Sequence, residues 1–328
     1  MAVLLITAFV TLAIILFAIH QKYTNGYCKS KKRLDGKTCI VTGGTRGMGL
    51  EIAREFARRG ARVIIACPFE EEGINAQKLI TNETGNHDVV FKHLNLACLK
   101  STRNFASDIL KTEDRLDLLV NNAGAGSKDA LTRDGLNFVM QINYYGHFLL
   151  TLLLFPLLQK TGTSRDKARI LNTTSLLHFI GKYEPKNMNR VGYWYKVQYY
   201  ANSKLCFVLF SKELARRIGG YNVVVNAIDP GVVGTKIFMM NFGTFIGLFI
   251  EQFLSLATKT PWQGCQTALH VALDDKLGDS SGGYFRNCEL CAPKAVCYDE
   301  DTAKKLWEES VQLVKLEPSE IEQLHRKL

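Results

Sequence analysis

The sequence of 328 residues lacks the signatures of several large classes of protein. It has no internal repeat and no low-complexity tract, which argues against a repeat architecture. Its net charge is +10, yet it has no basic stripe with interleaved aromatic residues and no zinc-finger spacing, so it does not indicate nucleic-acid binding. We attribute the excess of Lys and Arg to a nearby membrane surface, because anionic lipids attract these residues.

The cysteines also lack a pattern. Nine is an odd number, and they are scattered without the regular spacing of a disulfide scaffold, which is compatible with a reducing compartment. The stretch CELC at residues 288–291, with Cys297 nearby, could form a metal or redox site. It has no second Cys pair and no suitable His partner, so we predict ordinary thiols and no metal site.

Charge is absent from residues 2–19, AVLLITAFVTLAIILFAI, a run about long enough to cross a bilayer core. A cleaved signal peptide usually begins with basic residues, whereas here no Lys or Arg precedes Lys22. We therefore predict a retained signal-anchor helix over residues 1–20 and a basic linker over residues 21–35, with cleavage and secretion as the alternative. The basic flank consists of Lys22, Lys29, Lys31, Lys32, Arg33 and Lys37. By the positive-inside rule this flank stays in the cytosol, which predicts an endoplasmic reticulum membrane protein whose body faces the cytosol.

Residues 36–290 alternate apolar strands with helical stretches. The first unit, residues 37–67, comprises the strand KTCIVTG, a glycine-rich turn, a helix and the strand ARVIIAC. Continuous apolar strands that alternate with helices predict an α/β fold, a doubly wound parallel sheet of Rossmann type in a single domain. We expect residues 291–328 to form a helical tail, with Asp301 as the N-cap of one helix and a capping box at Ser319 and Glu322.

Residues 237–257, IFMMNFGTFIGLFIEQFLSLA, form a second apolar stretch. Its uninterrupted apolar part is short, and Asn241, Glu251 and Gln252 would be costly inside lipid, so we do not predict a second membrane span. It is either a buried helix or an apolar lid over a lipophilic substrate, and the two are compatible.

The glycine-rich turn TGGTRGMG indicates a binding site. Gly43, Gly44, Gly47 and Gly49 fall between the first strand and the first helix, where residues without Cβ allow the backbone to approach a pyrophosphate at a helix N-terminus. This context predicts a dinucleotide. An acidic residue after the second strand would favour NAD(H), but Cys67 and Pro68 stand there. Because Arg46 can supply a positive charge to a 2′-phosphate, we predict NADP(H), with NAD(H) less favoured.

Tyr200 and Lys204 lie one helical turn apart in YYANSK and share a helix face. A nearby ammonium stabilises tyrosinate, so we expect Lys204 to lower the pKa of Tyr200 and to make the phenol a usable acid or base. Ser175, at the end of the strand ARILNTTS, is the expected second hydrogen-bond donor to a carbonyl oxygen. The three residues predict hydride transfer between a carbonyl or alcohol and a nicotinamide.

These motifs, in this order, resemble the short-chain dehydrogenase/reductase family, and within it the membrane-anchored retinol dehydrogenase-like branch. The resemblance runs from about residue 37 to past residue 235 and rests on TGGTRGMG, NNAG at residues 121–124, NYYGHF, the Tyr–Lys pair and DPGVVGT at residues 229–235. It implies the catalytic set Asn143, Ser175, Tyr200 and Lys204, with Asn143 helping to hold a proton-relay water. It implies cofactor contacts from Gly43, Thr45, Arg46, Gly47, Met48, Gly49, Asn95, Asn122, Tyr200, Lys204, Pro230, Gly231, Val233 and Thr235.

The chain departs from the family pattern at the adenine and ribose positions. Asn95 stands where the family often has Asp, and Asn can still donate and accept hydrogen bonds. The retinol-type sequence ACR is ACP here, which leaves Arg46 as the basic residue for a 2′-phosphate.

The sequence therefore predicts an NADP(H)-dependent oxidoreductase that interconverts a lipophilic alcohol and its aldehyde or ketone, of the retinoid, steroid or isoprenoid class. The alternative is a catalytically idle, membrane-tethered scaffold that keeps the dinucleotide fold. A sugar-nucleotide epimerase would need a larger C-terminal substrate domain than the residues after Pro230 provide. The family resemblance also implies a homodimer, but no residue pattern in the sequence supports it.

Overall fold

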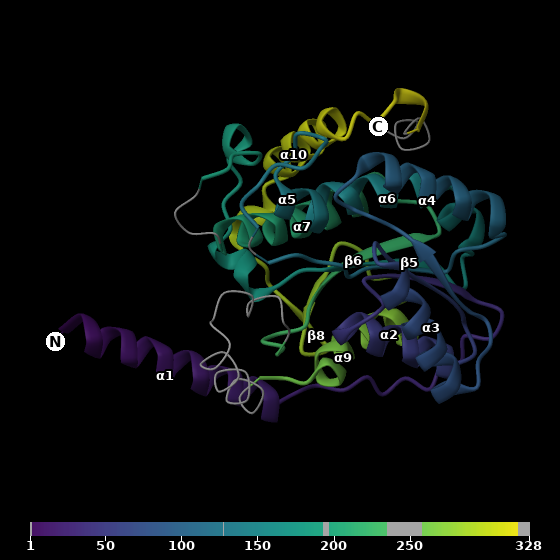
Figure 1. Ribbon diagram of the computed structural model, residues 1–328, viewed down its shortest axis with the longest axis horizontal. Helices are drawn as coiled ribbons and strands as arrows, with labels where there is room; N and C mark the ends of the chain where they lie inside the picture. The colour runs from purple at the N-terminus through teal and green to yellow at the C-terminus, as the bar shows by residue number, and fades with distance from the viewer. Residues whose placement is uncertain (1, 127, 193–196, 235–257, 321–328) are drawn as a thin grey trace.

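The computed structural model describes residues 2–126, 128–192, 197–234 and 258–320 (Figure 1). Its centre is an eight-stranded sheet with the order β3-β2-β1-β4-β5-β6-β7-β8. Every neighbouring pair from β3 to β7 is parallel, and β8 joins β7 in an antiparallel hairpin. The strands are β1 (Thr38–Thr42), β2 (Arg62–Cys67), β3 (Val89–His93), β4 (Leu118–Asn121), β5 (Ala168–Thr173), β6 (Val223–Asp229), β7 (Tyr284–Arg286) and β8 (Glu289–Cys291). The predicted doubly wound parallel sheet is confirmed.

Helices cover both faces of the sheet, as the continuous apolar strands require (Figure 1). One face carries α2 (Gly47–Arg58), α3 (Glu70–Thr84) and α9 (Pro261–Leu273), and the other carries α4 (Leu99–Thr112), α6 (Gly146–Thr161) and α7 (Val197–Arg217). Alternate residues of one strand enter opposite cores: Ile40 packs on the α4, α6 and α7 side, and Cys39 and Val41 pack on the α2 and α9 side. Short 3-10 helices span Leu176–Ile180, Pro185–Asn187, Asp275–Leu277 and Ala295–Tyr298.

The apolar residues 138–161 do not form one continuous α-helix. The stretch begins with α5 (Phe138–Met140), passes through a π-helical turn at Gln141–Tyr145 and continues as α6. Among the described residues, Phe138–Thr161 is the one stretch that passes a test of length and apolarity for crossing a membrane, but 83% of its most apolar window is buried. It belongs to the core of the folded domain.

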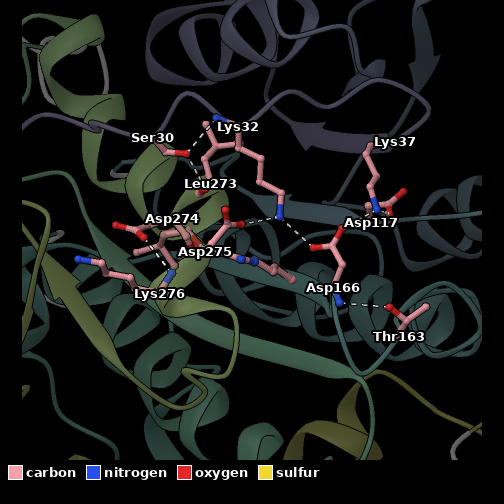
Figure 2. Close-up of polar contacts among 12 residues, drawn as sticks. Ser30, Lys32, Lys37, Asp117, Thr163, Asp166, Leu273, Asp274, Asp275 and Lys276 are labelled. Atoms are coloured by element: carbon pink, nitrogen blue, oxygen red, sulfur yellow. Dashed lines mark hydrogen bonds and ion pairs between the residues drawn. The ribbon is translucent and has the colours of Figure 1, made fainter.

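The N-terminal helix α1 (Ala2–Tyr23) projects away from the sheet, with its C-terminal end near α9 (Figure 1). The chain that follows lies along the body. The Ser30 hydroxyl donates to the Leu273 carbonyl at 2.7 Å, and the Lys32 ammonium lies 2.9 Å from carboxylate oxygens of both Asp166 and Asp275 (Figure 2). Lys37 pairs with the same Asp166 at 2.7 Å. These ion pairs use part of the basic flank that we expected to face lipid.

The C-terminal tail packs onto the domain through α10 (Glu300–Leu313), which lies over α7 (Figure 1). The predicted N-cap at Asp301 is wrong: Asp299 accepts from the backbone N–H groups of Asp301 and Thr302. Asp299 has the extended backbone of an N-cap, whereas Asp301 already lies inside the helix. The predicted capping box at Ser319 and Glu322 includes a residue outside the described part of the chain.

Candidate active site

The glycine-rich turn lies between β1 and α2 and has no room for a side chain at Gly43, Gly44 or Gly49. Gly43 has a φ of +65°, and a Cβ there would lie 2.9 Å from the Cα of Ala123. A Cβ on Gly49 would lie 2.2 Å from the Gly43 carbonyl oxygen. The turn is thus packed tightly against the segment that follows β4, and Gly49, in the first turn of α2, is packed against the turn itself.

The start of α2 can receive an anion. Its N-cap, Arg46, has an extended backbone and makes no side-chain capping hydrogen bond. The first backbone N–H groups of a helix have no partner within the helix, and the helix dipole adds a partial positive charge at that end. A Cβ at Gly47 would meet no heavy atom within 4 Å. The glycine turn and this open helix end therefore fit the pyrophosphate of a dinucleotide.

The groups that would meet an adenosine ribose lie at the end of β2. Burial raises the pKa of the Cys67 thiol, whereas a hydrogen bond with the Thr45 side chain and the charge of Arg46 act in the opposite direction. The Arg46 guanidinium lies 3.9 Å from the Glu72 carboxylate, and both side chains are exposed. The residue beside the ribose position is thus a neutral thiol with an arginine and a glutamate close to it.

Hydrogen bonds from the NNAG segment at the end of β4 hold Thr42, the residue before the glycine turn. The Thr42 hydroxyl accepts hydrogen bonds from the backbone N–H groups of Asn122 and Ala123, at 2.9 and 3.0 Å. The Asn122 side chain donates to the Thr42 carbonyl at 3.0 Å. The buried Asn121 amide donates to Thr151 and Asn172, which joins the middle of the sheet to the helices above it. Strand order reverses between β1 and β4, and ligands bind at such a crevice in open α/β sheets.

Asn143 lies in the π-helical turn at Gln141–Tyr145, a type of helix irregularity that is frequent at functional sites. Its side-chain amide donates to the Ala125 carbonyl at 3.0 Å and to the Ser203 hydroxyl at 2.9 Å, and its carbonyl oxygen accepts from the Ala125 N–H at 2.7 Å. The side chain is therefore committed to protein partners and ties the loop after β4 to α7. A Cβ placed on Gly124 would lie 3.5 Å from Asn143 Oδ1 and 3.9 Å from Lys204 Nζ, so this loop also reaches α7.

Ser175, Tyr200 and Lys204 meet at the carboxyl end of β5. Ser175 follows that strand, and its hydroxyl hydrogen-bonds the phenol of Tyr200 on α7. The Lys204 ammonium donates to the Thr173 carbonyl at 2.8 Å and lies 5.4 Å from the centre of the Tyr200 ring. Both Tyr200 and Lys204 are buried, at 7% and 3% exposure. The structure thus brings the four expected catalytic residues into one site.

The expected lowering of the Tyr200 pKa is wrong for the protein by itself. Burial raises the pKa of the phenol above its ordinary value, and the Ser175 hydrogen bond opposes this only in part. Burial also lowers the pKa of Lys204 from 10.5 to about 8, against the effect of the Asp229 carboxylate. The ammonium is directed at the Thr173 carbonyl, so desolvation outweighs its attraction for the tyrosinate form. Tyr200 is therefore a protonated phenol at neutral pH.

Sequence reasoning did not single out Asp229, although the residue stands in the quoted DPGVVGT segment. It is fully buried at the end of β6, where it accepts hydrogen bonds from the Tyr284 hydroxyl at 2.6 Å and from the Gly231 N–H at 2.8 Å. Burial raises the pKa of its carboxyl group, and the two hydrogen bonds oppose this shift. An acidic residue directly before Pro-Gly, at the end of an apolar strand, is the signal that could have identified it.

The remaining expected cofactor residues lie around the same edge of the sheet. Met48 is buried beside Gly264, and a Cβ placed on Gly264 would lie 3.0 Å from the Met48 sulfur. The Asn95 side chain follows β3 and accepts from the Ala97 N–H at 3.0 Å, so its carbonyl already serves a turn. Pro230, Gly231 and Val233 follow β6, and Val233 forms an isolated bridge with Lys259. Thr235 and the apolar stretch at 237–257 lie outside the described residues.

The wall beside Tyr200 is apolar. Val139, Tyr199 and Tyr200 form one buried cluster, and Phe138 and Leu177 pack against it. Tyr199 donates to Asp129 at 2.8 Å, so its hydroxyl is directed toward the loop that precedes α5. The Tyr200 ring is therefore packed against apolar side chains on this side.

Comparison with known proteins agrees with this geometry. The family described as short chain dehydrogenase matches residues 37–243. The chain is 41% identical over 310 residues to retinol dehydrogenase 13 of Homo sapiens, covering 92% of this chain and 91% of the relative. It is 37% identical over 299 residues to retinol dehydrogenase 11 of Homo sapiens, with 91% and 92% covered. The solved structure of a short chain dehydrogenase from Shigella flexneri complexed with NADP superposes with a TM-score of 0.59 at 26% identity, covering 78% of this chain and 98% of that chain. The chain therefore belongs to the short-chain dehydrogenase family, in its retinol dehydrogenase-like branch.

Proposed function

We propose that this oxidoreductase uses NADP(H) to interconvert a lipophilic alcohol and its aldehyde or ketone. The observation that carries the proposal is the hydrogen bond between Ser175 and Tyr200, beside the buried ammonium of Lys204, at the carboxyl end of β5. Two hydroxyl groups converge there, at the same edge of the sheet as the helix end that fits a dinucleotide phosphate. This arrangement favours an enzyme over an idle scaffold, because a scaffold has no use for a buried Tyr–Lys pair.

The chain's own residues would handle the proton. A bound nicotinamide cofactor would supply the hydride to the carbonyl carbon in reduction and accept it from the alcohol in oxidation. In reduction the Ser175 and Tyr200 hydroxyls donate hydrogen bonds to the carbonyl oxygen, and Tyr200 then gives its proton to that oxygen, which yields the alcohol. The raised pKa of Tyr200 keeps the phenol protonated, so the protein is ready to act as the acid. Lys204 is a cation below a pH of about 8 and would stabilise the tyrosinate left behind.

Asn143 would contribute through its backbone. Its side-chain amide already has three protein partners on Ala125 and Ser203. The π-helical turn changes the usual hydrogen-bond pairing of the backbone carbonyls at this position. The backbone carbonyl oxygen of Asn143 has a contact of 3.4 Å with His147 Nδ1. We propose that this carbonyl, and not the amide, holds the proton-relay water.

Arg46 and the end of β2 support NADP(H) over NAD(H). The ribose position carries Cys67 and Pro68, not an acidic residue that would bind a free 2′-hydroxyl. The exposed Arg46 guanidinium lies near the Cys67 thiol and can turn toward a 2′-phosphate. The Shigella flexneri structure, complexed with NADP, has the same fold.

The apolar cluster beside Tyr200 supports a lipophilic substrate. Phe138, Val139 and Leu177 provide hydrophobic contact. The charged groups that the structure places at this cluster are engaged: Lys128 lies over the Phe138 ring at 4.6 Å, and Asp129 accepts from Tyr199. Relatives at 37% and 41% identity are named retinol dehydrogenases, which makes retinoids the first class to test, followed by steroids and isoprenoids.

The helix α1 supports a membrane location. Its 22 residues would extend for about 33 Å, close to the thickness of a bilayer core. Phe9, Leu12 and Leu16 are more than half exposed, which is costly in water but favourable in lipid. We propose an anchor in the endoplasmic reticulum membrane with the active site on the cytosolic side. Protease treatment of sealed microsomes should remove the body, and protection of the body would contradict this orientation.

The decisive experiment is a turnover assay with the full chain purified in detergent or liposomes. NADPH and NADH oxidation would be followed with retinal, a steroid ketone, farnesal and a fatty aldehyde as substrates. We expect turnover of one lipophilic class with a preference for NADPH, and its loss in Tyr200→Phe. Dinucleotide binding without turnover on every substrate would instead support the scaffold function.

A further inference from the structure

The last turn of the projecting helix α1 contacts the segment after β6. The side-chain carbonyl oxygen of Gln21 accepts a hydrogen bond from the backbone N–H of Val232, at 3.0 Å. The two residues are 211 positions apart in the sequence. Val232 belongs to residues 230–233, the stretch in which the family resemblance implies cofactor contacts from Pro230, Gly231 and Val233. The predicted membrane anchor thus reaches directly into the predicted cofactor site.

The backbone of this segment depends on the contact. The Val232 carbonyl accepts from the Lys259 N–H at 2.9 Å, and the Gly231 N–H donates to Asp229 at 2.8 Å. The Val232 N–H has Gln21 as its acceptor. A half-buried backbone N–H without an acceptor is costly, so Gln21 completes the pairing of this turn.

Gln21 also packs against Gly231. A Cβ at Gly231 would lie 2.6 Å from Gln21 Oε1 and 3.2 Å from Lys259 Nζ. Gly231 has a φ of +79°, so the turn needs glycine for its backbone as well as for the space that Gln21 occupies. The side chain of Gln21 is therefore fitted against the turn at two adjacent residues.

The body fixes the position of this end of α1. The Gln263 side chain at the start of α9 donates to the Lys22 carbonyl at 3.4 Å, and the Asn287 side chain donates to the Thr24 carbonyl at 2.9 Å. The Gly26 N–H donates to the same Asn287 at 2.7 Å. Gln21 is thus presented to Val232 by a junction held at several points, near α9 and the β7–β8 hairpin (Figure 1).

We propose that Gln21 is a positioning residue for the cofactor, which holds the turn at Pro230–Val233 in the conformation that binds NADP(H). The inference rests on the proposed function in so far as it names the cofactor. It makes the end of the anchor helix a part of the binding site, so that cofactor affinity depends on a residue far from the glycine turn. Gln21 touches neither substrate nor reacting atoms and acts through Val232.

The test compares two substitutions in the full chain in detergent. Gln21→Met has nearly the same length and volume but no acceptor oxygen, whereas Gln21→Glu keeps an oxygen at the same reach. We expect Gln21→Met to weaken NADPH binding by about three- to tenfold, as the loss of one hydrogen bond would, and Gln21→Glu to restore most of the affinity. kcat should change less than the KM for NADPH. Thr24→Ala is the matched control, because the Thr24 hydroxyl donates to the His20 carbonyl in the same helix end but does not touch the turn.

Hydrogen exchange gives a readout that needs no cofactor. The Val232 amide should exchange faster in Gln21→Met than in the wild type and Thr24→Ala, because its acceptor is gone. Unchanged exchange at Val232, or faster exchange with unchanged NADPH affinity, would overturn the proposal. A wild type that binds neither dinucleotide would refute the proposed function, and the exchange comparison would still decide whether Gln21 holds the turn.

Discussion

The Lys204 ammonium donates a hydrogen bond to the carbonyl oxygen of Thr173, the last residue of β5, at 2.8 Å. The bond holds a buried cation at the carboxyl end of the sheet, where burial lowers its pKa to about 8. Lys204 is therefore a charged group that the fold tolerates at a cost, which is typical of a functional site.

The cost should be visible in the pH dependence of stability. An unfolded chain keeps the Lys204 proton up to its ordinary pKa of 10.5, whereas the folded chain releases it near 8. Between these values the unfolded state binds more protons, so the wild type gains stability as the pH rises. We expect the free energy of unfolding of the wild type, relative to Lys204→Met, to rise by on the order of 3 kcal/mol between about pH 8 and pH 10.5. Urea unfolding of both proteins measures it, and a difference that stays constant with pH would contradict it.

Asp229 should set the alkaline limit of activity. Its carboxylate opposes the lowering of the Lys204 pKa, so removing the charge lets that pKa fall further. In Asp229→Asn we expect the alkaline decline of kcat/KM to move to lower pH. Asp275→Asn is the control, because that carboxylate is exposed and pairs with Lys32. Lys32 also pairs with Asp166, which lies before the start of β5, at the end of that strand opposite to the site. An unmoved pH profile in Asp229→Asn would show that Lys204 does not govern the decline.

Tyr200→Phe should separate chemistry from binding. The substitution removes the proposed proton donor but keeps the ring, so we expect turnover to fall by about 100- to 10,000-fold while the Kd for NADPH stays near that of the wild type. Tyr199→Phe removes the neighbouring hydroxyl, which donates to Asp129, and should keep activity. Loss of turnover together with NADPH binding would mean that Tyr200 is structural.

Local patterns in the sequence were sufficient to predict the sheet and the order of its motifs. The strand–helix–strand unit expected at residues 37–67 is β1, α2 and β2, and the glycine turn lies at its expected place between β1 and α2. These features are visible locally in the sequence, because a strand that is buried on both faces requires a continuous apolar run and a tight turn requires glycines.

Contacts between distant segments were not predictable in the same way. The π-helical turn at Gln141–Tyr145 changes hydrogen-bond pairing without changing the apolar pattern, so the sequence does not reveal that three elements occur over residues 138–161. The spacing of Tyr200 and Lys204 shows a shared face but not that the ammonium is directed at Thr173. The contact of Gln21 with Val232 joins residues 211 positions apart, and no local pattern reports it.

Arg46 provides the test of cofactor choice. Its contact with Glu72 is long, at 3.9 Å between exposed groups, and such a pair contributes about 0–1 kcal/mol. A 2′-phosphate can therefore compete with Glu72 for the guanidinium and form a charge-assisted hydrogen bond. We expect Arg46→Ala to raise the KM for NADPH by about ten- to a hundredfold and to leave the KM for NADH nearly unchanged.

Two further variants complete this test. Glu72→Gln removes the competing carboxylate and should lower the KM for NADPH, since the guanidinium then has one anion to bind. Arg58→Ala, at the other end of α2, removes an exposed guanidinium that pairs with Glu55 and should change neither KM. If Arg46→Ala raised both KM values equally, Arg46 would act on the shared pyrophosphate and not on the 2′-phosphate. The preference for NADP(H) would then have to come from the neutral Cys67–Pro68 end of β2, because an acidic residue there is what selects NAD(H).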